Sequence, residues 1–354
     1  MNSSAPTKPL PASRWRKLAP KLWLAAVASG LSLVALEYAV RFLLPFYSPA
    51  SQVPFQATQE GVALGPIGQT IRQATPKGDY DVAVTFNQYG VRDEKDLLSA
   101  KPEDWFALGD SFTMGWGVDS SDRFSSRLER TLQESGSATR VFNLAIPNNF
   151  IGYQRLLKHA ESRGAIVGRL IVGVCMENDL QDYTDRKSDW DRTGDVLMTR
   201  KDAVRNWFKR HSSLYIATSF ALQRNEFTRR LCIGLGIARG MNELSSRNEW
   251  KEAVLQTSRD ELLKLVEGRR ALVLIIPARR LWDGDNIATE KRVHDEFVKR
   301  LGDAGLSVVD VRAELEATGE PLAHYFKTDP HWNSRGHALA ARQLSRSINS
   351  LPGH

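Results

Sequence analysis

The stretch Trp105-Phe106-Ala107-Leu108-Gly109-Asp110-Ser111 decides the fold class of this chain of 354 residues. Four successive apolar residues are typical of a strand that is buried on both faces, as the strands of a parallel sheet are. The Gly-Asp-Ser tripeptide then predicts a tight turn, because glycine permits the bend and Asp and Ser favour turns. The stretch therefore indicates an α/β protein whose first sheet strand ends beside a hydroxyl group.

Comparable apolar runs recur along the chain and alternate with helical patterns. We expect further strands at 141–144, 170–174, 271–276 and 307–311. We expect helices at 122–134 with Asp122 as N-cap, at 153–163, at 289–301 and at 334–348. This alternation predicts a central parallel sheet covered by helices. Residues 182–246 interrupt the pattern and indicate an insertion, either a lid or substrate platform or a solvated helical excursion.

Polar side chains follow three of the predicted strands at the point where each strand ends. Ser111 follows the first strand, Asn148 the second and Asn178 the third. Ligands of open parallel sheets bind outside the carboxyl ends of the strands, so we expect these residues to face one crevice. Asn178 offers an amide donor, and Ser111 and Asn148 offer backbone N–H groups, for a developing oxyanion. Taken singly, each of them is also typical of a turn or loop without a catalytic role.

A fourth segment, Asp329-Pro330-His331-Trp332-Asn333, precedes the last predicted helix. Pro330 favours an extended conformation for Asp329, and residues two apart in an extended segment share a face. The carboxylate can therefore fix the tautomer of the His331 imidazole, which is the usual kind of base that activates a serine. For this segment alone, an Asp-Pro turn with a surface histidine is the alternative. Its occurrence together with Ser111 favours a serine hydrolase.

These residues carry a resemblance to a known family. Gly109-Asp110-Ser111-Phe112, Asn178-Asp179 and the terminal Asp-x-His-Trp-Asn segment resemble motifs of the SGNH (GDSL-type) hydrolase superfamily, over a region that runs from about Asp79 to the end. The resemblance implies a flavodoxin-like three-layer sandwich with a central parallel sheet. It implies Ser111 as nucleophile, His331 as base and Asp329 as the acid that orients it. It further implies an oxyanion hole of Ser111, Asn148 and Asn178, with no cofactor and no metal.

Two positions depart from the family pattern. Asn148 stands where the second motif usually has glycine, so its side chain can crowd the acyl group or change the turn. Asp329 and His331 are separated by one residue rather than two, which resembles the polysaccharide O-acetylation branch of the superfamily. We therefore expect a serine esterase, or an O-acetyltransferase of the same mechanism, that acts on ester-linked acyl groups of cell-envelope glycans.

Two other classes of function remain as alternatives. The first is a catalytically inactive SGNH scaffold that binds a glycan in an envelope-polysaccharide assembly, which the departure at Asn148 keeps open. The second is a cytosolic nucleotide-binding α/β protein. The sequence disfavours it, because Gly115-Trp116-Gly117 comes too late after the first strand to form a phosphate-binding loop.

The first 44 residues carry a membrane-targeting pattern. Residues 1–21 form a basic leader that we expect in the cytoplasm, and residues 22–44 are expected to cross the membrane as one helix of the required length of about 20 residues. That span includes Glu37 and Arg41, which are four residues apart and can pair on one helix face near the outer interface. A similar leading helix occurs in bacterial membrane-anchored members of the superfamily. A signal peptide cleaved near Ala26-Val27-Ala28 is the alternative.

The expected orientation of the membrane helix also determines where the rest of the chain lies. We expect residues 45–100 to form a stalk and lead-in, and residues 101–351 to form the hydrolase-like domain outside the cytoplasmic membrane, in the periplasm or the extracellular space.

Charge and cysteine content exclude several classes of protein. The net charge is +7, but five basic residues precede the first acid, and the rest of the chain is nearly balanced. Without a basic stripe that includes aromatic residues, a nucleic-acid partner is disfavoured. The two cysteines, Cys175 and Cys232, are too few for a zinc cluster. Cys175 is expected in the core, and a disulfide between the two remains open.

Overall fold

The computed structural model describes residues 12–49, 53–58, 60–75, 78–191, 200–224, 227–228, 231, 251–283 and 286–351. Residues 1–11 of the expected leader, several parts of the expected insertion at 182–246, and Cys232 lie outside the described residues. The other cysteine, Cys175, is a buried free thiol.

Five parallel strands form the central sheet. They are β5 (Trp105–Gly109), β6 (Val141–Ala145), β7 (Arg169–Cys175), β8 (Arg270–Ile276) and β9 (Ser307–Asp310). Their order in the sheet is β6-β5-β7-β8-β9, and every neighbouring pair is parallel. The strand order reverses beside β5, which makes the carboxyl end of β5 a place where ligands of such sheets bind. The predicted fold class is confirmed.

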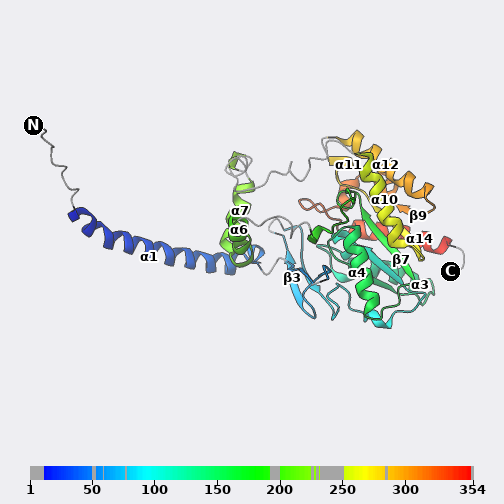
Figure 1. Ribbon diagram of the computed structural model, residues 1–354, viewed down its shortest axis with the longest axis horizontal. Coiled ribbons are helices and arrows are strands. Elements are labelled where there is room, and N and C mark those ends of the chain that lie inside the picture. Colours follow the sequence, from blue (N-terminus) through cyan, green and yellow to red (C-terminus); the bar gives the residue numbers. More distant parts are fainter. Residues whose placement is uncertain are drawn as a thin grey trace, which may run out of the picture.

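Helices cover both faces of this sheet and complete a three-layer sandwich (Figure 1). One face packs against α4 (Phe150–Ser162), α10 (Glu252–Val266) and α12 (Ile287–Asp303), which share a core cluster with the sheet. The other face packs against α3 (Phe124–Glu134) and α14 (Ser334–Ser350), with α13 (Arg312–Ala317) beside them. Short helical turns complete the domain: α2 (Ser111–Met114), η3 (Leu97–Ser99), η4 (Ser120–Asp122), α11 (Arg280–Asp283) and η5 (Pro321–His324).

The helix boundaries differ from the sequence-based expectation by up to three residues, and two of the helix starts have a structural explanation. α3 begins at Phe124, and Asp122 is not its N-cap. Asp122 belongs to η4 instead, and its carboxylate accepts a hydrogen bond from Arg127 at 2.5 Å. α4 begins at Phe150 rather than Tyr153, because the side chain of Asn149 accepts from two backbone N–H groups and caps the helix there.

The segment between α1 and β5 contributes to the main core. It contains two antiparallel pairs, β1 (Gln56–Ala57) with β2 (Ala63–Leu64), and β3 (Thr70–Ala74) with β4 (Asp81–Thr85). Val84, Phe86 and Leu97 from this segment are buried in the same cluster as the sheet. Part of the region expected to be a stalk and lead-in therefore packs as a layer of the globular body.

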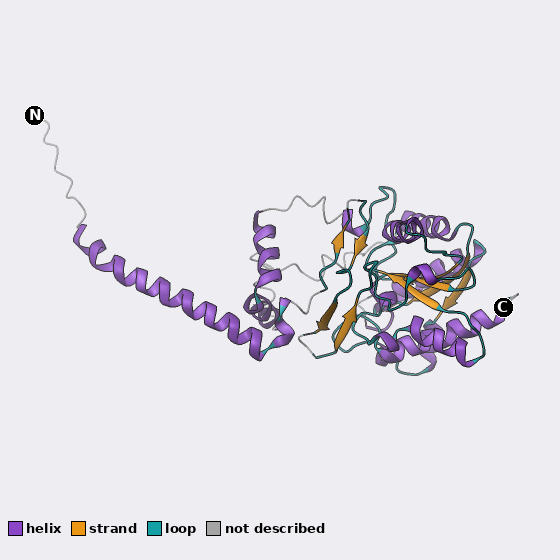
Figure 2. Cartoon of the chain, turned by 90° about the horizontal axis from the view of Figure 1, so that it is seen from below, coloured by secondary structure: helices purple, strands orange, loops and turns teal. Residues whose placement is uncertain are grey.

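The N-terminal helix α1 (Ala12–Leu43) projects from this body as a single rod (Figure 1). An 18-residue stretch within its segment Ala19–Leu43 has a mean hydropathy of 1.6, and none of its residues is buried, although Val40 near the end of the helix is buried. Among the described helices, α1 alone is long and apolar enough to cross a membrane. A signal sequence meets the same criterion. The turn η1 (Pro45–Tyr47) follows it, and α6 (Arg200–His211) and α7 (Ser213–Arg224) lie beside its end (Figure 2).

A buried carboxylate joins the amino ends of β5 and β6. The side chain of Asp104 is 1% exposed and accepts hydrogen bonds from Arg140 Nη2 at 2.7 Å, Arg140 N at 2.8 Å and Lys101 N at 2.9 Å. Burial alone would raise the pKa of Asp104, but the hydrogen bonds from Arg140 and Lys101 outweigh it and hold that pKa below its ordinary value.

Asp104→Asn is expected to lower the free energy of unfolding at pH 7 by about 2–3 kcal/mol, because it leaves Arg140 without its charged partner. The pKa of Asp104 is lower in the folded state, so its contribution is complete above the pKa of an unfolded aspartate and is lost as pH falls through the folded value. Urea unfolding of the full chain in mild detergent, at neutral and acid pH, measures both effects. Asp303→Asn, which removes a surface pair with Lys299, is the matched control, and equal losses in the two variants would contradict this assignment.

Candidate active site

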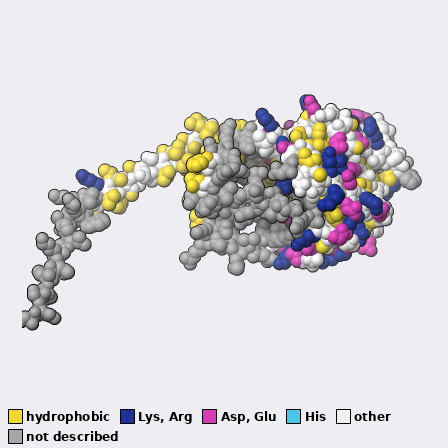
Figure 3. All heavy atoms as spheres, turned by 90° about the horizontal axis from the view of Figure 1, so that it is seen from above, with side chains coloured by type: hydrophobic (Ala, Val, Ile, Leu, Met, Phe, Trp, Pro, Cys, Tyr) yellow, Lys and Arg dark blue, Asp and Glu magenta, His cyan; other side chains and the backbone are white. Residues whose placement is uncertain are grey.

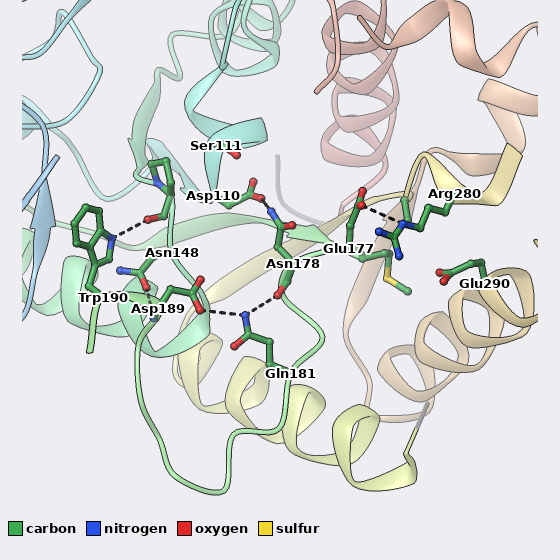
Figure 4. Close-up of a pocket in the computed structure, with 13 residues that line it drawn as sticks. Asp110, Ser111, Asn148, Glu177, Asn178, Gln181, Asp189, Trp190, Arg280 and Glu290 are labelled. Atoms are coloured by element: carbon green, nitrogen blue, oxygen red, sulfur yellow. Dashed lines mark hydrogen bonds and ion pairs between the residues drawn. The ribbon is translucent and has the colours of Figure 1, made fainter. Parts of the chain in front are cut away.

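A cleft of about 510 Å³ opens at the carboxyl ends of the strands (Figure 4). Its walls come from the segments that follow β5, β6, β7 and β8, and the three strand-end residues expected to share a crevice all lie in it. The lining residues are Asp110, Ser111, Pro147, Asn148, Met176, Glu177, Asn178, Gln181, Asp189, Trp190, Ala278, Arg280 and Glu290. Among the described residues, no group of three or more His, Cys, Asp or Glu side chains is placed to hold a metal ion.

The turn after β5 places Ser111 at the first position of α2. Asp110 caps this helix, because its carboxylate accepts from Phe112 N at 2.9 Å. Gly109 is required at the end of the strand, since a Cβ there would lie 2.3 Å from Thr113 Oγ1 and 2.8 Å from the carbonyl oxygen of Gly173. The backbone N–H of Ser111 is one of the first N–H groups of the helix, which have no intrahelical partner.

The Asp-Pro-His segment forms a tight reversal that aims His331 at this turn. Tyr325 and Trp332 form an antiparallel bridge across the base of the reversal, and Phe326 N donates to His331 O at 2.9 Å. The indole of Trp332 is fully buried and packs edge-on against Phe112, with ring centroids 5.7 Å apart. Asn333 then caps α14. The buried tryptophan and the helix cap together fix the position of the imidazole.

Ser111, His331 and Asp329 lie in hydrogen-bond contact. His331 Nε2 lies 2.7 Å from Ser111 Oγ, and His331 Nδ1 lies 2.5 Å from Asp329 Oδ1. Burial would raise the pKa of Asp329, but its contacts with His331 and a further hydrogen bond from Tyr80 outweigh burial and hold that pKa below its ordinary value. Asp329 is therefore ionised at neutral pH and fixes the tautomer in which Nε2 faces the serine.

Two aromatic residues that the sequence analysis did not identify support this histidine and its acid. Tyr80 precedes β4 and donates to Asp329 Oδ2 at 3.1 Å, while the indole N–H of Trp116 donates to the Tyr80 hydroxyl at 2.7 Å. The Trp116 ring stacks on His331, with centroids 5.6 Å apart and an angle of 21° between the planes. Burial and the nearby carboxylate of Asp329 raise the pKa of Tyr80, so its hydroxyl stays protonated and remains a donor.

The amide of Asn178 lies beside the serine turn. Its Nδ2 donates to Asp110 Oδ2 at 2.8 Å (Figure 4), which uses one of the two N–H bonds of the amide and leaves the second for a ligand. Burial raises the pKa of Asp110, although the charge of His331 and the hydrogen bonds from Phe112 and Asn178 oppose that rise. Asp110 thus orients both the turn that carries Ser111 and the amide of Asn178.

Asn148, which stands where the resembling family usually has glycine, has its side chain held away from the serine. Asn148 Oδ1 accepts from Asn149 N at 3.0 Å and from Asp189 N at 3.2 Å. The side chain packs against Gly152 in the first turn of α4, where a Cβ would lie 1.9 Å from Asn148 Cγ. Gly152 therefore provides the space that the side chain of Asn148 needs, and the sequence analysis did not connect these two positions.

Several polar side chains line the rest of the cleft, together with apolar residues. Arg280 forms an ion pair with Glu177 at 3.4 Å, and Gln181 Nε2 donates to Asn178 O at 2.8 Å and to Asp189 Oδ1 at 3.1 Å (Figure 4). The Trp190 indole N–H donates to Pro147 O at 3.1 Å and leaves the ring on the cleft wall. Donors, acceptors and one large aromatic ring are suited to a hydroxyl-rich ligand.

Comparisons with known proteins find similar sequences and similar structures. Residues 242–354 match the family model described as the SGNH hydrolase-like domain of the acetyltransferase AlgX. This part of the chain is therefore similar to an SGNH hydrolase-like domain. A stretch of 102 residues is 31% identical to the probable alginate O-acetylase AlgJ of Pseudomonas syringae pv. tomato. This stretch covers 27% of this chain and 26% of that protein. The match thus spans about a quarter of that relative's length.

Solved structures similar to this chain include a lipase/acylhydrolase and a lipolytic protein. A lipase/acylhydrolase from Enterococcus faecalis matches with a TM-score of 0.42 and 14% identity, over 69% of this chain and 95% of that chain. A lipolytic protein of the G-D-S-L family from Veillonella parvula matches with a TM-score of 0.40 and 12% identity, over 70% of this chain and 99% of that chain.

Gly152→Ala is expected to lower the free energy of unfolding by about 1–3 kcal/mol, because the new methyl group overlaps Asn148 and forces one of the two to move. Gly302→Ala is the matched control: Gly302 also lies in a helix, α12, and a Cβ there meets nothing within 4 Å. The control is expected to be neutral or to stabilise by up to about 1 kcal/mol. Urea unfolding of both variants decides the matter, and equal stabilisation by the two alanines would contradict the account of Asn148.

Proposed function

We propose that the protein is a serine esterase, or an O-acyltransferase of the same mechanism, in which Ser111 is the nucleophile, His331 the general base and Asp329 the acid that orients it. The observation that supports this most directly is the chain of contacts from Ser111 Oγ to His331 Nε2 at 2.7 Å and from His331 Nδ1 to Asp329 Oδ1 at 2.5 Å. The first of these distances is within the range in which a base can take the proton of a serine hydroxyl.

The reaction begins when Ser111 Oγ attacks the carbonyl carbon of an ester while His331 Nε2 accepts the hydroxyl proton. The carbonyl oxygen becomes negatively charged, and the backbone N–H groups of Ser111 and Asn148 and the amide of Asn178 form its oxyanion hole. His331 then protonates the leaving alcohol, and the acyl group stays on Ser111. Water, or the hydroxyl of a sugar, attacks the acyl-serine in the second half of the reaction, with His331 again as base.

The proposed substrate is an ester-linked acyl group on a glycan of the cell envelope. The polar side chains and the Trp190 ring that line the cleft support this choice, and the matched relative carries the name of an alginate O-acetylase. We also propose that α1 anchors the protein in the cytoplasmic membrane, with residues 1–21 inside, residues 22–44 in the membrane, and residues 45–100 and 101–351 outside. The apolar segment Ala19–Leu43 supports an anchor, and the basic residues before it support the orientation.

A fluorophosphonate probe is expected to label the wild-type protein covalently, because its phosphorus is attacked by an activated serine. Ser111→Ala should abolish labelling, and His331→Ala should slow it by about 10³-fold or more. Ser162→Ala, which removes an exposed serine on α4, is the control and should label normally. A wild-type protein that resists the probe but binds glycans, with binding unchanged in Ser111→Ala, would contradict the proposal and favour the non-catalytic glycan-binding scaffold.

Tyr80 is a positioning residue for Asp329, and Tyr80→Phe should lower kcat about fivefold with little change in KM, since one hydrogen bond is worth about 1 kcal/mol. The lost hydrogen bond also raises the pKa of Asp329, so the deficit should grow as pH falls. Profiles of kcat against pH with an acetyl-ester substrate measure this. Tyr89→Phe removes an exposed tyrosine–aspartate contact with Asp96 and is the control. A deficit in Tyr80→Phe that is independent of pH would contradict this role.

A further inference from the structure

Helix α1 caps both ends of the turn between α6 and α7. The carboxylate of Glu37 accepts from Ser212 Oγ at 2.8 Å, Ser213 N at 2.8 Å and Leu214 N at 2.9 Å, at the N-terminus of α7. Arg41 donates to the carbonyl of His211 at 2.8 Å, at the C-terminus of α6, and also to Glu37 at 2.9 Å. Each charge has the sign that its helix end favours. We call residues 200–224 the α6–α7 hairpin.

The hydrogen bonds that Glu37 accepts offset the cost of placing its carboxylate in an apolar helix. A carboxylate near hydrocarbon is costly unless its hydrogen-bonding capacity is satisfied within the protein. Glu37 receives four such bonds, three of them from the α6–α7 hairpin. With this hairpin in place, helix α1 can lie in a bilayer although it carries Glu37 and Arg41.

The α6–α7 hairpin exposes large apolar side chains. Trp207 is 56% exposed, Phe208 40%, Phe220 37% and Leu222 44%. The apolar surface of α1 continues onto this end of the molecule (Figure 3). Tyr47, which follows α1, packs on Phe220 with ring centroids 5.9 Å apart, so the apolar surface of the hairpin is continuous with that of the anchor. Exposed side chains of this size in one region mark an interaction surface.

The position of the hairpin along α1 indicates which partner this surface meets. Lys21 and Arg41 are 20 residues apart in α1, about 30 Å along a helix, which is about the thickness of the hydrocarbon core. Arg41 and Glu37 therefore lie near the boundary of that core. Figures 1 and 2 show α6 and α7 running across the direction of α1 at this level, between α1 and the globular body. A helix in that position lies in the plane of the membrane surface.

We propose that the α6–α7 hairpin lies in the headgroup layer of the leaflet that faces the catalytic domain, held there by the clamp of Glu37 and Arg41, with its exposed apolar side chains among the lipids. This inference rests on the proposal that α1 crosses the membrane. Tryptophan is favoured at that depth, and the exposed Lys209 and Arg210 at the end of α6 suit anionic headgroups. The catalytic domain then has a second membrane contact besides the anchor, which fixes the direction in which its cleft opens.

Depth measurements on the full chain test this inference. Single cysteines introduced as Leu222→Cys, Leu31→Cys or Ile166→Cys, in a Cys232→Ser background, carry the fluorophore NBD in vesicles of phosphatidylcholine and phosphatidylglycerol. Cys175 is buried and stays unlabelled. Leu31 is 67% exposed in the middle of the apolar helix and reports the anchor, while Ile166 is 51% exposed on the globular body and reports the aqueous side.

The probe at Leu222 is expected to show blue-shifted emission and to be quenched by lipids that carry a spin label near the headgroup. The probe at Leu31 should also emit in the blue but be quenched by a spin label deeper in the bilayer. The probe at Ile166 should instead be quenched by iodide in the water. Glu37→Ala should transfer the Leu222 probe to iodide quenching and leave the Leu31 probe in lipid. Two outcomes with the Leu31 probe in lipid would contradict the inference: the Leu222 probe is quenched by iodide, or a protein partner shields it from both quenchers. In both cases the proposed membrane anchor would still be supported. If the Leu31 probe is itself in water, the proposed anchor fails first.

Discussion

The buried carboxylate of Asp110 is the interaction on which the candidate active site depends. One of its oxygens accepts from the N–H of Phe112 and begins the short helix that presents Ser111. The other accepts from the amide of Asn178 and so connects the ends of β5 and β7. A single side chain therefore orients the proposed nucleophile and one of the proposed oxyanion donors. Its burial, which raises its pKa, is the cost of that arrangement.

Much of the fold could be predicted because the local pattern and the tertiary structure require the same residues. A strand of a parallel sheet must be apolar on both faces, so runs such as Trp105 to Leu108 and Leu272 to Ile276 identify strands directly. The proximity of Ser111, Asn148 and Asn178 followed from the rule that the strand ends of such a sheet share one edge. The contact between Asp329 and His331 followed from local backbone geometry. The contact of His331 with Ser111, 220 residues earlier, was inferred from the joint occurrence of these motifs and from their resemblance to the superfamily, because no local pattern links the two segments.

The remaining parts of the site depend on contacts between distant segments that leave no local pattern. Tyr80 lies at the start of a short hairpin strand, and nothing in its neighbourhood in the sequence indicates that its hydroxyl reaches Asp329. The substitution of asparagine for glycine at position 148 raised the concern that it crowds the site, and Gly152, which gives that side chain its space, is recognisable only once α4 is placed. The pairing of Glu37 with Arg41 was foreseen from their spacing, but not the capping of two further helices by these charges.

The hairpin of β3 and β4 has a practical consequence for anyone who wishes to crystallise the globular body without helix α1. The sheet begins at Trp105, which makes a truncation near residue 100 look natural. Such a fragment would lack Val84 and Phe86 from its interior and Tyr80 from beside Asp329. A fragment that retains both this packing and the contact of Tyr80 with Asp329 has to begin close to Val53, which itself packs against the main core, ten residues beyond the last turn of α1.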